Sequence, residues 1–324
     1  MQLLDVVIIE SSARCNLKCT MCPRLSFSPG NGDMSLDTFK KIENYLHLTY
    51  GVDLTGWGEP LLNKNLFEMI DRATAKGCWI HFLTNATLLN EDVAKHLVLS
   101  GVRSIGVSID GATPGTYESI RIGAKLDRVI NNLKRLNELK KTYNRTNPTV
   151  TLVYVMMKQN IHELSEMVWL AFELGVKNVV FKNQNVLTKP KDVTEALFLE
   201  DQKGILADAK RAVDDALYLA TVLGVSVEFH PFESSGTTLC APNPLRSLFI
   251  TWDGFVSPCC NLGHRVPRMV GPEEALSDTS LFFGNIIDKP LDEIFLSENY
   301  ISFRNAFTNG YPKECEGCNL VYGV

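Results

Sequence analysis

The chain has 324 residues and a formal net charge of −5, a length that can bury a large core and hold one large α/β domain or a domain with an appendage. The charge gives no basic patch for nucleic acid. No apolar run reaches the roughly 20 residues that span a bilayer, and the N-terminus lacks the basic segment and cleavage site of a signal peptide. We therefore expect a cytoplasmic protein with no nucleic-acid partner and no membrane partner.

Strands and helices alternate through the first two-thirds of the sequence. Apolar runs of strand length predict strands at 3–9, 52–55, 79–83, 104–109, 150–156 and 178–181. Apolar residues at helical spacing predict helices at 36–48, 65–76, 90–100, 126–141, 161–174 and 200–223. The alternation predicts an α/β fold with a parallel sheet, and six strand–helix steps predict a partial (β/α)6 barrel, TIM-like but short of the full eight units.

The alternation stops near residue 231, after a further strand at 225–229 that we expect to leave the barrel. We therefore expect a barrel domain at 1–231 and a small cysteine-rich domain at 232–324. Within the second domain, the turn Asp253-Gly254 predicts a hairpin of strands 247–252 and 255–257. A helix is expected at 290–307, with Pro290 as its first residue.

Three cysteines stand on one short loop directly after the first strand. Cys15, Cys19 and Cys22 form the spacing CxxxCxxC. A [4Fe–4S] cluster normally takes four thiolates, so three on one loop leave one iron open to a ligand that is not protein. Structural zinc is the alternative, but zinc sites usually pair two CxxC half-sites or mix Cys with His.

With the motifs that follow the next strands, this loop resembles the radical S-adenosylmethionine (SAM) superfamily. That resemblance implies a [4Fe–4S] cluster bound by the three cysteines, with SAM on the open iron. It also implies SAM contacts after successive strands, from Gly58-Glu59, Thr84-Asn85, Ser108 with Asp110, and Arg121. A guanidinium such as that of Arg121 is the natural fork for the SAM carboxylate. Each motif alone is weak, but together they occur in the expected order.

A second set of cysteines lies near the C-terminus. Cys240 and Cys259 stand in the spacing CX13GX4C around Gly254, and Cys315 and Cys318 form a CxxC. This set resembles the twitch subdomain, the shorter relative of the SPASM domain, in the layout of 2-deoxy-scyllo-inosamine dehydrogenases. The resemblance implies an auxiliary [4Fe–4S] cluster bound by the four cysteines. Zinc held by the same four thiolates is the alternative.

Two further cysteines and several polar residues remain. Cys78 is expected to be a buried apolar side chain. Cys260 adjoins a candidate ligand and is our candidate catalytic residue, as a hydrogen-atom donor to a substrate radical, although packing beside the cluster would also explain it. By analogy with the family, Trp57 faces the substrate. His230 and the 182–185 loop, which includes Gln184, are expected at the mouth of the barrel.

The resemblance implies an enzyme that reductively cleaves SAM to a 5′-deoxyadenosyl radical and takes a hydrogen atom from its substrate. We expect a two-electron oxidation in which the auxiliary cluster accepts an electron, with a flavodoxin- or ferredoxin-type protein as reductant. Peptide-modifying members of the superfamily often carry a separate leader-peptide recognition domain at the N-terminus, whereas here the first strand begins within the first few residues. We therefore favour a small-molecule substrate such as a sugar, aminocyclitol or cofactor precursor. A peptide maturase and a redox-neutral epimerase or lyase remain as alternatives, and an electron-transfer protein with two clusters is a further one.

Overall fold

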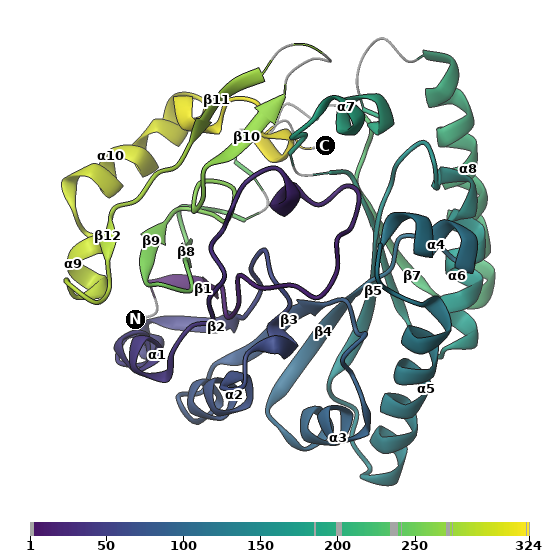
Figure 1. Ribbon diagram of the computed structural model, residues 1–324, viewed down its shortest axis with the longest axis horizontal. Helices are drawn as coiled ribbons and strands as arrows, with labels where there is room; N and C mark the ends of the chain where they lie inside the picture. The colour runs from purple at the N-terminus through teal and green to yellow at the C-terminus, as the bar shows by residue number, and fades with distance from the viewer. Residues whose placement is uncertain are drawn as a thin grey trace.

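The computed structural model describes residues 3–184, 186–198, 203–233, 239–240, 242–269, 273, 275–321 and 323. Its centre is a curved parallel sheet that does not close into a barrel (Figure 1). Seven of its strands follow the chain order, β1 to β7. They are β1 (Leu4–Ile9), β2 (Thr49–Asp53), β3 (Trp79–Thr84), β4 (Val102–Ser108), β5 (Thr149–Val155), β6 (Asn178–Lys182) and β7 (Ser226–Phe229). The predicted α/β partial barrel is thereby confirmed.

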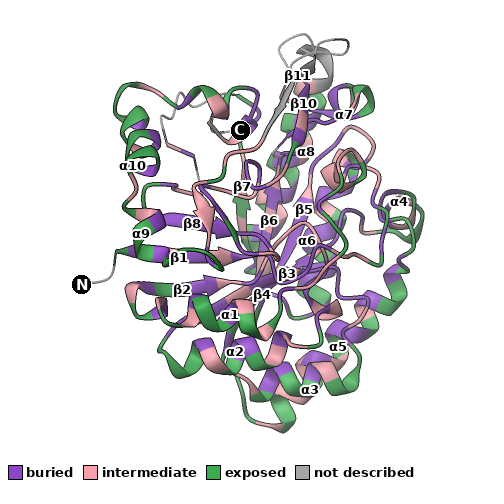
Figure 2. Ribbon diagram, turned by 60° about the vertical axis from the view of Figure 1, so that its left-hand side comes forward, coloured by how far each residue is buried: buried purple, intermediate pink, exposed green. Residues whose placement is uncertain are grey.

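The helices that cover the outer face of the sheet are α1 (Leu36–Glu43), α2 (Leu66–Ala75), α3 (Glu91–Leu99), α5 (Leu126–Thr142), α6 (Leu164–Glu173) and α8 (Lys203–Leu223). Their sheet-facing sides are buried and their outer sides are exposed (Figure 2). Two short helices lie apart from the main helical layer: α4 (Pro114–Ile120) packs against α5, and α7 (Pro190–Glu195) lies beside strand β10 (Val266–Met269) (Figure 1). Side chains cap the N-termini of several helices. At the start of α1, for example, Ser35 accepts a hydrogen bond from Thr38 N.

Four details of the barrel differ from the sequence prediction. The helix expected at 36–48 ends at Glu43, since the chain must turn through a short 3-10 helix at Leu46–Leu48 to start β2 at Thr49. The short helices α4 and α7 were not predicted. Strand β7 does not leave the sheet, because it pairs in parallel with β6.

The chain after β7 returns to the opposite edge of the sheet, next to β1. Strand β8 (Ser247–Ile250) pairs in parallel with β1, and β9 (Phe255–Ser257) pairs antiparallel with β8. The predicted hairpin is therefore present, and its turn uses Gly254 at φ +93°, a conformation that favours glycine. The sheet ends at β12 (Gly284–Asn285), while β10 (Val266–Met269) and β11 (Ala275–Thr279) form a separate ribbon. The division into two domains remains a prediction.

The helix expected at 290–307 is two helices. Helix α9 (Leu291–Phe295) begins after Pro290, which caps it and is not its first residue. Ser297 then caps α10 (Glu298–Asn305) by accepting from Tyr300 N. The short 3-10 helices are Pro23–Leu25, Leu46–Leu48, Pro60–Leu62, Ile161–Glu163, Ala306–Asn309, Lys313–Cys315 and Asn319–Val321.

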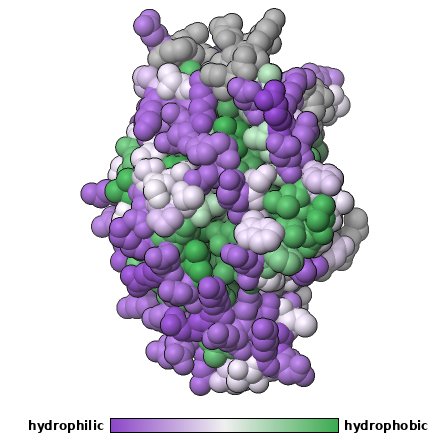
Figure 3. Space-filling model, turned by 90° about the vertical axis from the view of Figure 1, so that its right-hand side faces the viewer, coloured by the Kyte–Doolittle hydropathy of each residue, from purple (hydrophilic) through white to green (hydrophobic). Residues whose placement is uncertain are grey.

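This topology brings distant segments to one edge of the sheet. The carboxyl ends of β1 to β6 meet there, where parallel α/β folds carry their chemistry. The loop after β1, purple in Figure 1, crosses that edge. The outer side near α8 is mostly hydrophilic, with some hydrophobic side chains between (Figure 3). Within the described part of the chain, no helix combines the length and apolar character needed to cross a membrane.

Candidate active site

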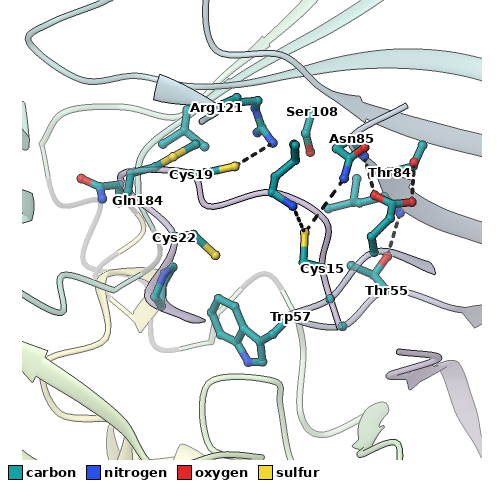
Figure 4. A pocket seen from close by; sticks show the side chains of 18 of the residues that line it. Cys15, Cys19, Cys22, Thr55, Trp57, Thr84, Asn85, Ser108, Arg121 and Gln184 are labelled. Atoms are coloured by element: carbon teal, nitrogen blue, oxygen red, sulfur yellow. Dashed lines mark hydrogen bonds between the residues drawn. The ribbon is translucent and has the colours of Figure 1, made fainter. Parts of the chain in front are cut away.

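Cys15, Cys19 and Cys22 line a pocket of about 210 Å³ at the carboxyl edge of the sheet. Their sulfur atoms face the same space in Figure 4. The loop that carries them is fixed to the end of α4 by two backbone hydrogen bonds, from Lys18 N to Ile122 O (3.0 Å) and from Thr20 N to Ile120 O (2.8 Å). The three predicted ligands are therefore presented together by an anchored loop.

Arg121 places a positive charge beside these thiols. Its Nη1 lies 3.8 Å from Cys19 Sγ. Burial raises the pKa of Cys19 to about 11, and the charge of Arg121 opposes that shift. Arg121 therefore favours the thiolate of Cys19, which is the form that a metal ligand takes.

Asp110 lies behind the pocket wall and holds Arg121. Its Oδ2 is 2.6 Å from Arg121 Nε, and its Oδ1 accepts from Val155 N (2.8 Å). Asp110 is fully buried and is not among the residues that line the pocket, whereas Ser108 and Arg121 are. The carboxylate therefore orients the arginine, and the predicted contact of Asp110 with SAM remains a prediction.

The Gly58-Glu59 segment packs directly under the cysteine loop. A Cβ at Gly58 would lie 2.2 Å from Ser12 O and 2.4 Å from Arg14 O, so only glycine allows this close approach. The buried Glu59 carboxylate accepts hydrogen bonds from Thr84 Oγ1 (2.7 Å) and Asn85 N (2.8 Å). Burial raises the pKa of Glu59. Glu59 thus joins the end of β2 to the end of β3.

Asn85 connects that turn to the cysteine loop. Its Nδ2 donates to Asn16 Oδ1 (3.0 Å) and lies 4.0 Å from Cys15 Sγ. Thr84, Asn85, Gly58 and Glu59 all line the pocket (Figure 4). The structure therefore brings together the motifs after β2 and β3 that the sequence singled out.

The predicted substrate residues divide into two groups. Trp57 and Gln184 line the pocket, together with Lys182 and Asn183 of the same loop. His230 is not among the lining residues; its Nε2 lies 3.6 Å from Glu228 Oε1, and burial lowers its pKa. Asn185 of the predicted loop lies outside the described residues.

A buried pair that the sequence analysis missed stands beside Trp57. Glu10, fully buried at the end of β1, accepts from His264 Nε2 (2.9 Å) and from Trp57 N (3.1 Å). The only sequence signal was an acidic residue after an apolar strand. Since His264 follows the β8–β9 hairpin, the pair ties the C-terminal segment to the pocket wall.

The four cysteines of the second set are gathered from three segments of the chain. Burial raises the pKa of Cys240 to about 11 and that of Cys315 to about 12, and the nearby Cys318 adds to both shifts. Burial also raises the pKa of Cys259, with contributions from Cys315 and Cys318. Cys240, Cys315 and Cys318 are buried and Cys259 is partly buried, so the four thiols lie in a part of the protein that is largely removed from water.

Two polar side chains near this second site have N–H donors that are either unpartnered in the described chain or directed at sulfur. Arg268 is 2% exposed, and neither its Nε nor its Nη2 has a hydrogen-bond partner in the described chain. Asn261 Nδ2 lies 3.3 Å from Cys318 Sγ. A buried guanidinium and an amide directed at sulfur fit an anionic group rich in sulfur, so the residues suit an iron–sulfur cluster.

Cysteine geometry also bears on the zinc alternative. Zinc draws four sulfur atoms to about 2.3 Å from one point. A [4Fe–4S] cluster instead gives each thiolate its own iron, so its ligands stand farther apart.

The remaining two cysteines are placed differently. Cys78 is buried, and its Sγ lies 3.5 Å from Leu46 O, in the core as expected. Cys260 is not among the residues that line the pocket, but its carbonyl oxygen accepts from Trp57 Nε1 (3.1 Å). Cys260 therefore lies behind the indole, between the pocket and Cys259.

Known proteins share both parts of this arrangement. Residues 9–171, half of the chain, match the family model of the radical SAM superfamily, and residues 240–319 match the SPASM model, described as an iron–sulfur cluster-binding domain. The tungsten-containing aldehyde ferredoxin oxidoreductase cofactor-modifying protein of Pyrococcus furiosus is 28% identical over 98% of this chain and 88% of its own length. The PqqA peptide cyclase of Rhodopseudomonas palustris is 27% identical over 55% of this chain and 46% of its length.

Among solved structures, Streptococcus suis SuiB bound to S-adenosylmethionine superposes with a TM-score of 0.68. At 18% identity it covers 100% of this chain and 72% of its own, and this likeness concerns the fold alone. The sequence-derived cofactors, SAM and iron–sulfur clusters, agree with the matched families. The chain belongs to the radical SAM superfamily and carries a SPASM-type domain for an auxiliary iron–sulfur cluster.

Proposed function

We propose that this enzyme oxidises a small molecule by two electrons, with the auxiliary cluster as the acceptor of the second electron. A cofactor precursor is the favoured class of substrate. Its support is the relative from Pyrococcus furiosus, which is named as cofactor-modifying and aligns along nearly the whole chain. A flavodoxin- or ferredoxin-type protein is the proposed reductant.

The observation that carries the proposal is the wall shared by the two cysteine sites. Trp57 lines the pocket that holds Cys15, Cys19 and Cys22. The same indole donates to the carbonyl of Cys260, the neighbour of Cys259. A substrate in this pocket, whose wall includes Trp57 (Figure 4), would therefore lie close to both proposed cluster sites.

Bound SAM and its cluster supply the radical that removes a hydrogen atom from the substrate. The chain supplies the geometry for that step. In our assignment, Cys15, Cys19 and Cys22 hold the first cluster, while Arg121, oriented by Asp110, binds the carboxylate of SAM. Cys240, Cys259, Cys315 and Cys318 hold the auxiliary cluster.

A two-electron oxidation also releases a proton, which needs an acceptor. We assign this role to Lys182, which lines the pocket and makes no ion pair or hydrogen bond through its side chain with any described residue. Burial lowers its pKa. The other ionisable groups of the wall are engaged, since Glu59 is hydrogen bonded to Thr84 and Arg121 is paired with Asp110.

The test is an anaerobic turnover experiment with the reconstituted enzyme, SAM and dithionite. Two [4Fe–4S] clusters require about eight irons per chain, and 5′-deoxyadenosine must form. With a panel of cofactor precursors, we expect a product lighter by two hydrogen atoms, one 5′-deoxyadenosine per product and no net use of reductant. A product of unchanged mass would contradict the oxidation.

The Lys182 assignment is tested by Lys182→Met. We expect this variant to keep uncoupled SAM cleavage while product formation falls at least tenfold, because only the proton transfer is removed. Product formation at the wild-type rate across the pH range would exclude Lys182 as the proton acceptor.

Peptide modification is a second candidate function. It is favoured by the relative named as a peptide cyclase, although that match spans about half of each chain. Binding of synthetic precursor peptides, measured by fluorescence anisotropy, separates the two. Saturable binding followed by a mass change in the peptide would replace the small-molecule proposal.

A further inference from the structure

Arg268 is a buried cation beside the Cys315–Cys318 turn of the auxiliary site. It lies on β10, and its side chain is among the largest that are fully enclosed. Its Nη1 donates to Glu314 O (2.6 Å) and to Glu316 O (2.8 Å). The guanidinium is therefore hydrogen bonded to the backbone carbonyl groups on both sides of Cys315.

The described chain provides no counter-charge for this cation. No carboxylate of the described residues forms an ion pair with Arg268, unlike Arg121, which has Asp110 at 2.6 Å. A buried charge without a partner costs several kcal/mol. Since two donors, Nε and Nη2, also lack partners in the described residues, the site is incomplete without an anion.

Arg268 lies directly beside a proposed cluster ligand. The two carbonyl groups that its Nη1 binds belong to the residues before and after Cys315. The amide of Asn319, one residue after Cys318, is already engaged, because its Nδ2 donates to the main-chain oxygen of Gln184 (2.9 Å). The unpartnered donors beside this turn are therefore those of Arg268.

We infer that Arg268 is the counter-ion of the auxiliary cluster and raises its reduction potential. Cluster potentials depend on net charge, hydrogen bonds to sulfur and exposure to solvent. Reduction adds a negative charge to a group that is already anionic, so an adjacent cation stabilises the reduced form more than the oxidised form. The auxiliary cluster becomes a better acceptor for the electron of a substrate radical.

This inference deepens the proposed role of the auxiliary cluster as electron acceptor, but its test needs no substrate. The cluster's potential can be measured in the resting enzyme. Failure of the inference is therefore distinguishable from failure of the proposed reaction, which would appear only in turnover.

The experiment is a redox titration of the full chain with both clusters, followed by electron paramagnetic resonance. The signal that does not change on addition of SAM reports the auxiliary cluster. In Arg268→Met, we expect the ratio of reduced to oxidised cluster at the wild-type midpoint to fall about tenfold, which corresponds to 59 mV for one electron. Arg268→Lys, which keeps the charge, should recover most of the shift.

The matched control is Arg246→Met, which removes a cation that already has its own partner, Asp5, at the surface. Its auxiliary potential should equal that of the wild type. An unchanged potential in Arg268→Met would overturn the inference and leave Arg268 as a clamp on the Cys315 turn. If Arg268→Met binds no auxiliary cluster, Arg268→Gln replaces it as the test, because Gln also lacks the positive charge. Equal potentials in Arg268→Gln and Arg268→Lys would then overturn the inference, since the charge would have no effect.

Discussion

The two cysteine sites of this enzyme are built in opposite ways. The first takes three thiols from one loop of eight residues, Cys15 to Cys22, and opens into a pocket. The second takes four thiols from three segments and encloses them. In our assignment, the open site leaves an iron for SAM, whereas four thiolates leave none at the enclosed site. Sequence spacing and burial together are the basis for proposing one site for radical chemistry and the other for electron transfer.

The arginines beside the two sites differ in whether a carboxylate balances their charge. Arg121 at the first site is neutralised by Asp110, so its charge is balanced before any cofactor binds. Arg268 at the second site has no such carboxylate among the described residues. The first site can therefore exchange SAM without leaving a bare charge, while the second depends on a cluster that stays in place.

The largest effect is expected from Cys19→Ala, which removes one of the three protein ligands that we assign to the open cluster. SAM cleavage should disappear, because that cluster has no fourth thiolate to replace the lost one. About four irons per chain should remain, belonging to the auxiliary cluster. The measurements are 5′-deoxyadenosine by chromatography and total iron.

The matched control for this variant is Cys78→Ala. Cys78 is a buried cysteine outside both sets, so its loss should leave iron content and SAM cleavage unchanged. Retained SAM cleavage in Cys19→Ala would contradict the assignment of the first site.

Cys315→Ala should separate the two sites. We expect measurable SAM cleavage but no product, because the radical forms while its electron has no acceptor. Product and 5′-deoxyadenosine are measured in the same reaction, and near-ultraviolet circular dichroism checks that the variant keeps its packing. Normal product formation would show that the auxiliary cluster is not the electron acceptor.

A smaller, structural effect is expected from Asp110→Asn. Removing one partner of a buried ion pair costs about 3–5 kcal/mol, and Arg121 would be left as the uncompensated charge. Because Arg121 lines the pocket, the carboxylate of SAM should then supply part of the missing charge. We expect a lower melting temperature than in the wild type, and a larger rise on addition of SAM.

The exposed pair Arg246–Asp5 provides the control. Asp5→Asn should change stability by about 0–1 kcal/mol, with no effect on the response to SAM. Equal SAM-induced shifts in Asp110→Asn and wild type would place Arg121 outside the SAM site.

The sequence predicted the barrel well, because each strand, helix and motif can be recognised from a short stretch of residues. Each strand is one short apolar run, and each motif follows a strand end, which a parallel sheet brings to one edge. The helix at 36–48 was overextended because helical spacing continues past Glu43, and only the pairing of β2 with β1 decides where the strand begins.

Side-chain direction and long-range pairing could not be predicted in this way. The motif that contains Ser108 and Asp110 gave both residues the same expected role, but the structure turns one to the pocket and the other to Arg121. The Glu10–His264 pair joins residues far apart in the chain. Neither relation leaves a periodic signal in one sequence.

The smallest effect is expected from Cys260→Ala, and it tests whether the enclosed site serves only for electron transfer. Cys260 stands behind Trp57, and its side chain is not needed to complete four ligands. If the substrate radical passes its electron to the auxiliary cluster, product formation should stay within about twofold of wild type, an effect of less than 1 kcal/mol.

A redox-neutral epimerase would behave differently, because its substrate radical must regain a hydrogen atom. With Cys260 as the donor, the alanine variant would cleave SAM and consume substrate without returning it as the epimer. Turnover in deuterium oxide adds a second readout, since an exchanging thiol would deliver deuterium to the product. Deuterium in the wild-type product and its loss in Cys260→Ala would assign hydrogen donation to the second site, whereas an unlabelled, oxidised product in both would leave electron transfer as its role.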